Sequence, residues 1–262
     1  MFRLRRFCCA FALLGSFLIV SATDRHRDDW RTYKPILKSQ VTQLDLSTAQ
    51  SLLTHFCADL SDTGDFGPVC KTQHLTPEFS DIGDEQFHPE SVIFGRFLDS
   101  SSDDAAISGW SLEGHGDRWG GTLLLRREGA EWKPVWYKSG VITEYCEKAE
   151  RPDGREVLLC ELEDGGWGHQ YHELNAIDLR QASKVTPPIL SVDSFESNGC
   201  DGQKQTMVAL EWRIPRRSFS VLVRTPEWHR TPGGYCGGEL PNRPKPSVRM
   251  NFEVTNDGVR PR

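Results

Sequence analysis

The sequence predicts a mainly β fold with one N-terminal helix, built from antiparallel propeller-blade-like sheets in an incomplete propeller or a sandwich. Three observations predict it. Helical periodicity is confined to one stretch, residues 44–60. From Ser91 onward, short strand-like segments alternate with turn signals about every 8 to 12 residues. Six cysteines follow an apolar leader, as in disulfide-stapled exported domains.

The composition favours a folded protein and argues against one class of partner. The chain has 262 residues, of which 37% are hydrophobic and 10% aromatic, so it can bury a core. It carries 37 acidic against 31 basic residues, a formal charge of −6. Nucleic-acid binders normally concentrate basic charge on one surface. We therefore expect no nucleic-acid partner.

Residues 1–22 are typical of a secretory signal peptide. Arg3, Arg5 and Arg6 form a basic start, and residues 7–20 are an uncharged run of 14. Val20-Ser21-Ala22 is a small-residue cleavage site. A membrane span needs about 20 apolar residues, so this run is short for one, and a retained signal anchor is the alternative. We expect a secreted or periplasmic protein with no membrane span after cleavage.

Six cysteines remain after that cleavage, and an even number in an exported chain indicates three disulfides. No Cys-x-x-Cys pair is present, which favours disulfides over a thiolate metal site. Spacing then selects among the pairings: we expect Cys57–Cys70, Cys146–Cys160 and, by elimination, Cys200–Cys236.

The second of these pairs is the best argued. Cys146 and Cys160 lie symmetrically about Asp153, in a strand, turn, strand pattern. A three-residue hairpin loop there would place the two cysteines directly opposite each other, within disulfide reach. The first pair, Cys57 and Cys70, brackets a short loop.

The order of elements predicts four regions. After the signal peptide, residues 23–43 form a polar leader. Residues 44–90 contain the helix and a disulfide loop. The helix is expected over 44–60, where Asp45 or Ser47 can cap its start, and a loop-rich passage follows over 61–90.

Residues 91–262 form the β-rich domain. A hairpin is expected across residues 127–130, and residues 226–247 form a long proline-rich loop. The expected strands cover residues 91–98, 105–112, 121–127, 132–137, 140–146, 156–162, 169–179, 189–195, 206–214, 219–224 and 248–254.

Two segments of this domain look like copies of one unit. Residues 94–107 run from Phe-Gly through an acidic turn into a hydrophobic strand, and a Trp-Gly-Gly turn follows at residues 119–121. Residues 153–168 repeat an acidic turn, a hydrophobic strand and a glycine-rich turn. A repeat of about 50 residues suits a propeller blade.

The first of these segments, from Phe94-Gly95 to Gly109, resembles a degenerate and partial FG-GAP/VCBS repeat, a family of extracellular β-propellers with an Asp-rich calcium loop. With Asp104 at the final acidic position, the earlier ligand positions fall on Arg96, Leu98 and Ser100, which supply no carboxylates. The resemblance therefore implies an extracellular, blade-like β fold in which the calcium site is absent or rebuilt around Asp99 and Asp103. We expect no cofactor and no bound metal.

Motifs for catalysis are sparse. No nucleophile elbow and no phosphate loop occurs, and His172-Glu173 lacks the second histidine of a zinc-protease motif. Paired carboxylates, Glu161 with Glu163 or Asp103 with Asp104, leave one alternative open: a secreted hydrolase acting on glycans.

Tryptophans mark the candidate binding site. Among eight in the chain, Trp119 and Trp167 lie in comparable glycine turns of the two repeat-like segments. They predict an aromatic surface for a glycan or protein partner, with Asp117, Arg118 and Asp164 supplying hydrogen bonds. Core packing of the same rings is the alternative, and it is the one that we favour for these two tryptophans. The sequence thus predicts an exported, disulfide-stabilised β-rich binding or structural module, more readily than an enzyme.

Overall fold

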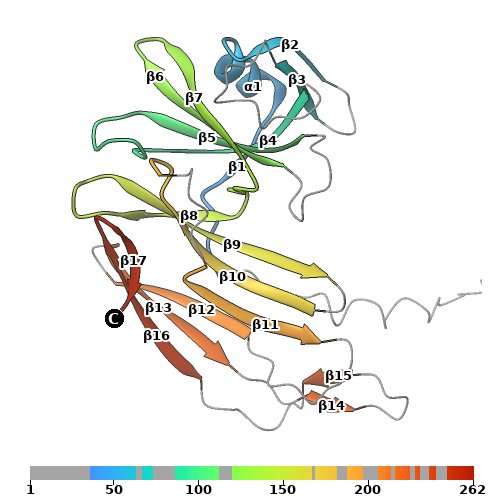
Figure 1. Cartoon of the computed structure of the whole chain (residues 1–262), viewed down its shortest axis with the longest axis vertical. Helices are drawn as coiled ribbons and strands as arrows, with labels where there is room; N and C mark the ends of the chain where they lie inside the picture. The colour runs from blue at the N-terminus through green and yellow to red at the C-terminus, as the bar shows by residue number, and fades with distance from the viewer. Residues whose placement is uncertain are drawn as a thin grey trace, which may run out of the picture. The chain divides into compact units, whose positions relative to one another are not determined.

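The computed structural model describes most of the chain from Ile36 to its end (Figure 1). All described residues belong to the unit Lys34–Arg262. The expected signal peptide and most of the expected leader lie outside them. The described ranges are 36–62, 67–72, 86–111, 120–166, 169–181, 188–196, 206–213, 216–224, 228–230, 236–239 and 247–262.

The largest sheet, sheet A, is antiparallel and has seven strands in the order β2-β3-β4-β5-β6-β7, with β1 paired to β4. Aromatic pairs show that it curls, because β4 reaches β7 across two intervening strands: the rings of Phe87 and Tyr137 lie 5.7 Å apart and those of Phe94 and Trp132 5.8 Å. The strands are β1 (Thr42–Gln43), β2 (Cys57–Asp62), β3 (Pro68–Thr72), β4 (Gln86–Gly95), β5 (Asp104–Ser111), β6 (Gly121–Glu128) and β7 (Glu131–Ser139).

Two further sheets have four strands each, and one has two. Sheet B has the order β11-β10-β9-β8, and sheet C the order β12-β13-β16-β17. All pairs are antiparallel. The strands are β8 (Cys146–Glu150), β9 (Glu156–Gly166), β10 (His169–Ile177), β11 (Leu190–Glu196), β12 (Thr206–Arg213), β13 (Ser218–Arg224), β14 (Trp228–Arg230), β15 (Cys236–Glu239), β16 (Val248–Thr255) and β17 (Gly258–Pro261).

Three apolar cores join these elements. The first lies between helix α1 (Leu46–Leu53) and one face of sheet A. Because side chains alternate along a strand, the other face of sheet A supplies different residues to a second core, which it shares with sheet B. The third core lies between sheets B and C. The chain is thus mainly β with one helix among the described residues, as the sequence predicts.

Residues 36–44, which we call the strap, contribute to all three cores. Leu37 is buried in the core of sheets B and C, and Val41 packs against the core of sheets A and B. Leu44 is buried in the core beneath α1. Most of this stretch belongs to the expected polar leader. A segment that the sequence predicts to be largely polar and extended thus contributes an apolar side chain to each of the three cores.

The helix is shorter than predicted. Asp45 caps it, as expected, by accepting a hydrogen bond from the backbone N–H of Thr48 at 2.7 Å. It ends at Leu53 rather than at residue 60, because Cys57 and the residues after it pair with β3 and are linked to it by the Cys57–Cys70 disulfide. Tertiary pairing overrides local helix propensity here.

The β8–β9 hairpin has the predicted register. Cys146 and Cys160 are direct partners and form a buried disulfide, with Cα atoms 4.1 Å apart. Gly154 in the connecting loop has a positive φ of 83°, a conformation that glycine adopts without strain. Residues 140–145 precede the strand rather than forming part of it. Two of the three predicted disulfides are therefore confirmed, and Cys200 lies outside the described residues.

Candidate functional site

The sequence-predicted binding residues fall largely outside the described part of the chain. Asp117, Arg118 and Trp119 belong to residues 112–119, and Trp167 to residues 167–168. Asp164 lies on β9, but its side chain is not among those described. In the sequence, residues 112–119 lie between β5 and β6. A candidate binding site is therefore to be sought among the described residues near the end of β5 and the start of β6.

Four of them form what we call the Trp110 cluster: His88, Glu90, Trp110 and Glu144. His88 on β4 and Trp110 on β5 are direct cross-strand partners. Their rings stack with centroids 3.6 Å apart and planes 8° from parallel. Trp110 is half-buried, so part of the indole surface stays accessible to solvent.

Burial favours the neutral form of the His88 imidazole. The residue is buried, and its Nδ1 atom has no hydrogen-bond partner among the described residues. Burial lowers the pKa of His88 below its ordinary value of 6.5. The neutral imidazole is therefore favoured, and it adds no positive charge beside Trp110.

Glu90 and Glu144 come from different parts of the chain, and they lie close enough for the charge of Glu90 to act on Glu144. Glu90 lies in the irregular stretch of β4 between Pro89 and Ser91, and Glu144 lies between β7 and β8. Both residues are exposed. Burial of the carboxyl group nevertheless raises the pKa of Glu90, and burial followed by the charge of Glu90 raises the pKa of Glu144. Carboxyl groups that solvent reaches but protein partly desolvates are typical of binding and catalytic sites.

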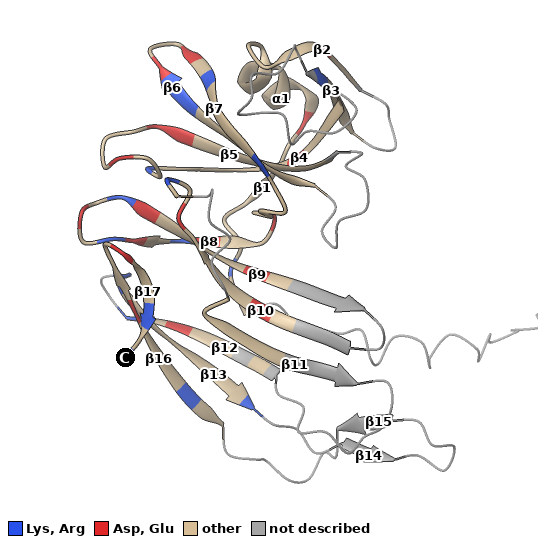
Figure 2. Cartoon of the chain, in the orientation of Figure 1, with Lys and Arg blue, Asp and Glu red and all other residues tan. Residues whose placement is uncertain are grey.

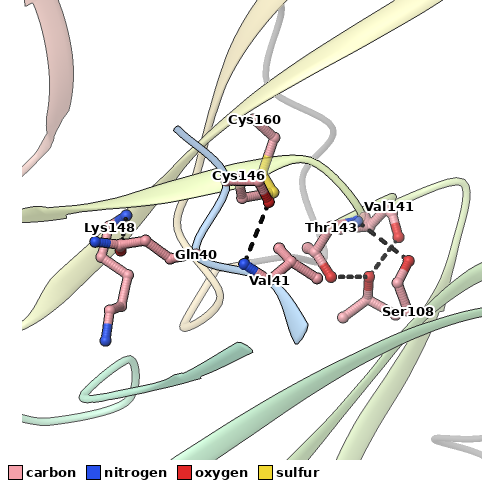
Figure 3. Close-up of a disulfide and its surroundings, with 10 residues drawn as sticks. Gln40, Val41, Ser108, Val141, Thr143, Cys146, Lys148 and Cys160 are labelled. Carbon is pink, nitrogen blue, oxygen red and sulfur yellow. Dashed lines mark hydrogen bonds between the residues drawn. A yellow bond between two sulfur atoms is a disulfide. The ribbon is translucent and has the colours of Figure 1, made fainter. Parts of the chain in front are cut away.

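A buried hydroxyl network holds the segment that carries Glu144. The backbone N–H of Thr143 donates to Oγ of Ser108 at 3.2 Å (Figure 3). Thr122 Oγ1 donates to the backbone oxygen of Val141 at 2.6 Å and lies 3.2 Å from the hydroxyl of Thr143. All three hydroxyl side chains are buried. Satisfied networks of this kind rigidify what they hold, so Glu144 extends from a fixed segment.

The carboxylate pairs suggested by the sequence are placed differently. Asp103 is exposed and pairs with Arg127, whereas Asp104 is buried and pairs with Arg126. Glu161 is also buried, and its side chain accepts backbone N–H groups of the strap. The side chain of Glu163 is not among those described. Neither pair therefore presents two described carboxylates to solvent.

The acidic turn that resembles a calcium loop is filled by protein donors. Asp104 accepts backbone N–H groups of Phe97 and Leu98 at 2.9 and 2.8 Å. Arg126 bridges Asp104 and Asp99, and hydrogen bonds from Ser101, helped by Arg126, hold the pKa of Asp99 below its ordinary value. Across the described residues, no group of three or more His, Cys, Asp or Glu side chains is placed to hold a metal ion.

Sequence reasoning missed three members of the Trp110 cluster. His88 and Glu90 precede the first expected strand, and Glu144 lies 54 positions beyond Glu90 in an expected strand. Trp110 is one of eight tryptophans in the chain. The residue that sets it apart, His88, lies on the neighbouring strand β4 and is 22 positions away in the sequence. The sequence offers one signal for this site: the glycine-rich stretch at residues 114–117, which follows the strand that carries Trp110.

Comparisons with known proteins give no family. No family model, no curated protein and no solved structure shows a significant match to the sequence. Among the described residues, none of the helical structure is long and apolar enough to cross a membrane. Acidic and basic residues are interspersed along the described strands of the three larger sheets (Figure 2).

Proposed function

We propose that the protein is an exported, disulfide-stabilised β-rich binding module, and that the Trp110 cluster binds a glycan. The leader in the sequence supports export. The two disulfides lie in the interior of the fold, which is compatible with folding in an oxidising compartment.

One observation carries the glycan assignment: a stacked His88–Trp110 pair, two residues along β4 from Glu90, whose charge acts on Glu144. An aromatic ring packs against the apolar face of a sugar ring, and carboxylates accept hydrogen bonds from its hydroxyl groups. The His88 ring covers one face of the indole, so the sugar would contact the remaining accessible surface of Trp110.

The packing of sheets B and C supports the sandwich form of the fold over the incomplete propeller. The two sheets enclose one shared core, to which Leu159 and Leu174 contribute from sheet B and Phe219 and Phe252 from sheet C. Two sheets packed face to face around such a core are the arrangement of a β-sandwich.

A second function is favoured by the same two carboxyl groups. Glycoside hydrolysis needs one carboxylic acid that holds its proton and a second carboxylate nearby. The charge of Glu90 favours the protonated form of Glu144, which is the relation that such an acid requires. The alternative is therefore a secreted glycan hydrolase with Glu144 as the acid and Glu90 as its partner.

The test is calorimetric titration of the exported protein with cello-, chito-, xylo- and manno-oligosaccharides. Replacing Trp110 by Ala is expected to weaken binding by about 1–3 kcal/mol. The matched control is Trp132→Ala, which removes a half-buried ring from the opposite end of sheet A and is expected to bind like the wild type. Far-ultraviolet circular dichroism checks that each variant is folded.

Two outcomes decide between the functions. Binding without release of reducing sugar supports the binding module, and release that stops in Glu144→Gln supports the hydrolase. The glycan assignment is overturned if none of the oligosaccharides binds, or if Trp110→Ala binds as tightly as the wild type.

A further inference from the structure

Two buried glutamates of sheet B hold the backbone of the strap. The N–H groups of Ile36 and Leu37 both donate to Oε2 of Glu161, at 3.0 and 3.3 Å. The next N–H group, that of Lys38, donates to Oε1 of Glu147. Three successive backbone donors are thus received by two carboxyl groups, which fixes this end of the strap between sheets B and C.

The middle of the strap is tied to β8 beside the disulfide. The backbone N–H of Gln40 donates to the backbone oxygen of Cys146 at 2.8 Å (Figure 3). In return, the N–H of Lys148 donates to the side-chain oxygen of Gln40 at 2.9 Å. The far end joins sheet A, where Thr42 and Gln43 pair with β4. The strap is therefore hydrogen-bonded to β8 of sheet B and to β4 of sheet A. At its start it is held by the carboxyl groups of Glu147 and Glu161, which we call the clip.

The two glutamates of the clip are not equivalent. Both oxygens of Glu147 are engaged, since Oε2 accepts from the Trp212 indole at 2.8 Å and lies 3.9 Å from the guanidinium of Arg216. Oε1 of Glu161 is buried and has no hydrogen-bond partner among the described residues. An ionised Glu161 would leave negative charge on that oxygen without compensation, whereas a proton there removes the charge.

The electrostatics agree with this geometry. Burial raises the pKa of Glu161 to about 7, against the smaller lowering influence of the N–H groups of Leu37 and Ile36. Several titratable or charged residues lie on the strands and segments next to Glu161. They include Glu147, Lys148 and Glu150 on β8, His172 and Glu173 on β10, Tyr145 before β8, Lys38 on the strap, Arg216, and Glu163 on β9 itself, the last with a side chain outside the described part.

We propose that the strap is a pH-dependent latch, which closes over protonated Glu161 and is released more readily when Glu161 ionises. The closed state binds the proton more tightly than an open state in which water reaches the carboxyl group. Closure is therefore most favoured below about pH 4.5, weakens as the pH rises from there to about 7, and changes little above that.

The size of the effect follows from the change in pKa. If opening returns Glu161 from about 7 to its ordinary value of 4.5, the opening equilibrium changes by at most about 300-fold between acid and alkaline pH. Release withdraws Leu37, Val41 and Leu44 from three cores, so the latch controls contacts between layers and not only its own mobility.

Hydrogen exchange on the full exported chain tests the latch. The measured quantity is the protection factor of the strap amides, Leu37, Lys38 and Gln40, normalised to intrinsic rates from pH 5.5 to 8.5. In the wild type, protection of these amides is expected to fall by about tenfold or more as the pH rises from 5.5 to about 7 and then to level off, while protection of the β9 and β10 amides stays constant. In Glu161→Gln, strap protection is expected to be independent of pH.

Glu156→Gln is the matched control. Glu156 lies on the same strand but bonds to the backbone N–H of Arg96 at 2.8 Å and not to the strap. This variant is expected to keep the wild-type pH profile. Constant strap protection in the wild type, or loss of the profile in Glu156→Gln, overturns the proposal. The wild-type profile alone decides the matter if Glu161→Gln does not fold.

Discussion

Asp104 and Arg126 are direct partners across β5 and β6, with Nε of Arg126 3.2 Å from Oδ1 of Asp104. The carboxylate is buried, and its second oxygen receives the backbone N–H groups of Phe97 and Leu98. The turn between β4 and β5 is thus organised around one carboxylate whose charge is balanced by protein groups.

Replacing Asp104 by Asn is expected to lower the free energy of unfolding by about 2–4 kcal/mol, because it removes a buried carboxylate that pairs with Arg126 and accepts the backbone N–H groups of Phe97 and Leu98. Urea unfolding monitored by tryptophan fluorescence measures the change. The control is Asp103→Asn, which breaks only an exposed pair with Arg127 and is expected to change stability by less than about 0.5 kcal/mol. Equal losses in the two variants would contradict this account of the turn.

Calcium is expected to have little influence on stability. Backbone N–H groups and Arg126 already engage both oxygens of Asp104 and both oxygens of Asp99. Addition of EDTA or of millimolar calcium should shift the Tm by less than about 2 °C. A stabilisation of many degrees by calcium would show that the acidic turn binds the ion after all.

The Cys146–Cys160 disulfide is expected to contribute about 2–4 kcal/mol to stability, the typical value for a bridge that closes a short loop. The double variant Cys146→Ala/Cys160→Ala, compared with the wild type in urea unfolding, gives this number. An unchanged midpoint would mean that the hairpin register alone holds the two strands.

Intact-mass and non-reducing peptide analysis of the exported protein tests the processing and the third bridge. We expect a mature chain that begins after Ala22 and contains a Cys200–Cys236 link in addition to the two described disulfides. A chain that still begins at Met1 would contradict the export hypothesis. A free thiol among the six cysteines would contradict the pairing.

His88 gives the cluster a pH dependence of defined sign. Since burial lowers its pKa in the folded state, the unfolded chain binds a proton more readily below pH 6.5. The wild type should therefore lose stability relative to His88→Gln as the pH falls through 6.5 and below. Unfolding measured in parallel from pH 7.5 to 5 gives the difference, and a constant difference would mean that His88 titrates normally.

Local patterns were sufficient to predict much of the β structure. The strands expected at 121–127 and 132–137 match β6 and β7, because alternating β-forming residues flank a turn at Gly129. The Cys146–Cys160 register was also predictable, since a short hairpin loop determines which residues face each other. Where two paired strands are neighbours in the sequence, the residue pattern and the turn between them are enough to predict the strands and their register.

Long-range pairing set the limits of prediction. Residues 68–72 were expected to be loop, yet they form β3 between β2 and β4. The clip of Glu147 and Glu161 depends on a strap more than 100 positions away. The Trp110 cluster likewise joins β4, β5 and the segment before β8. Such sites arise from the stacking of sheets, which no short window of the sequence encodes.

The central claim is that the Trp110 cluster binds a sugar, and the indole N–H resonance of Trp110 reports on it most directly. It can be assigned with Trp110→Ala and followed in ¹⁵N-correlated NMR spectra while pooled cello-, chito-, xylo- and manno-oligosaccharides are added. The account predicts a saturable shift of this resonance together with the backbone amides of His88 and Glu144, weakened in Glu144→Gln. Spectra in which those resonances do not move, or in which only resonances elsewhere move, would contradict it.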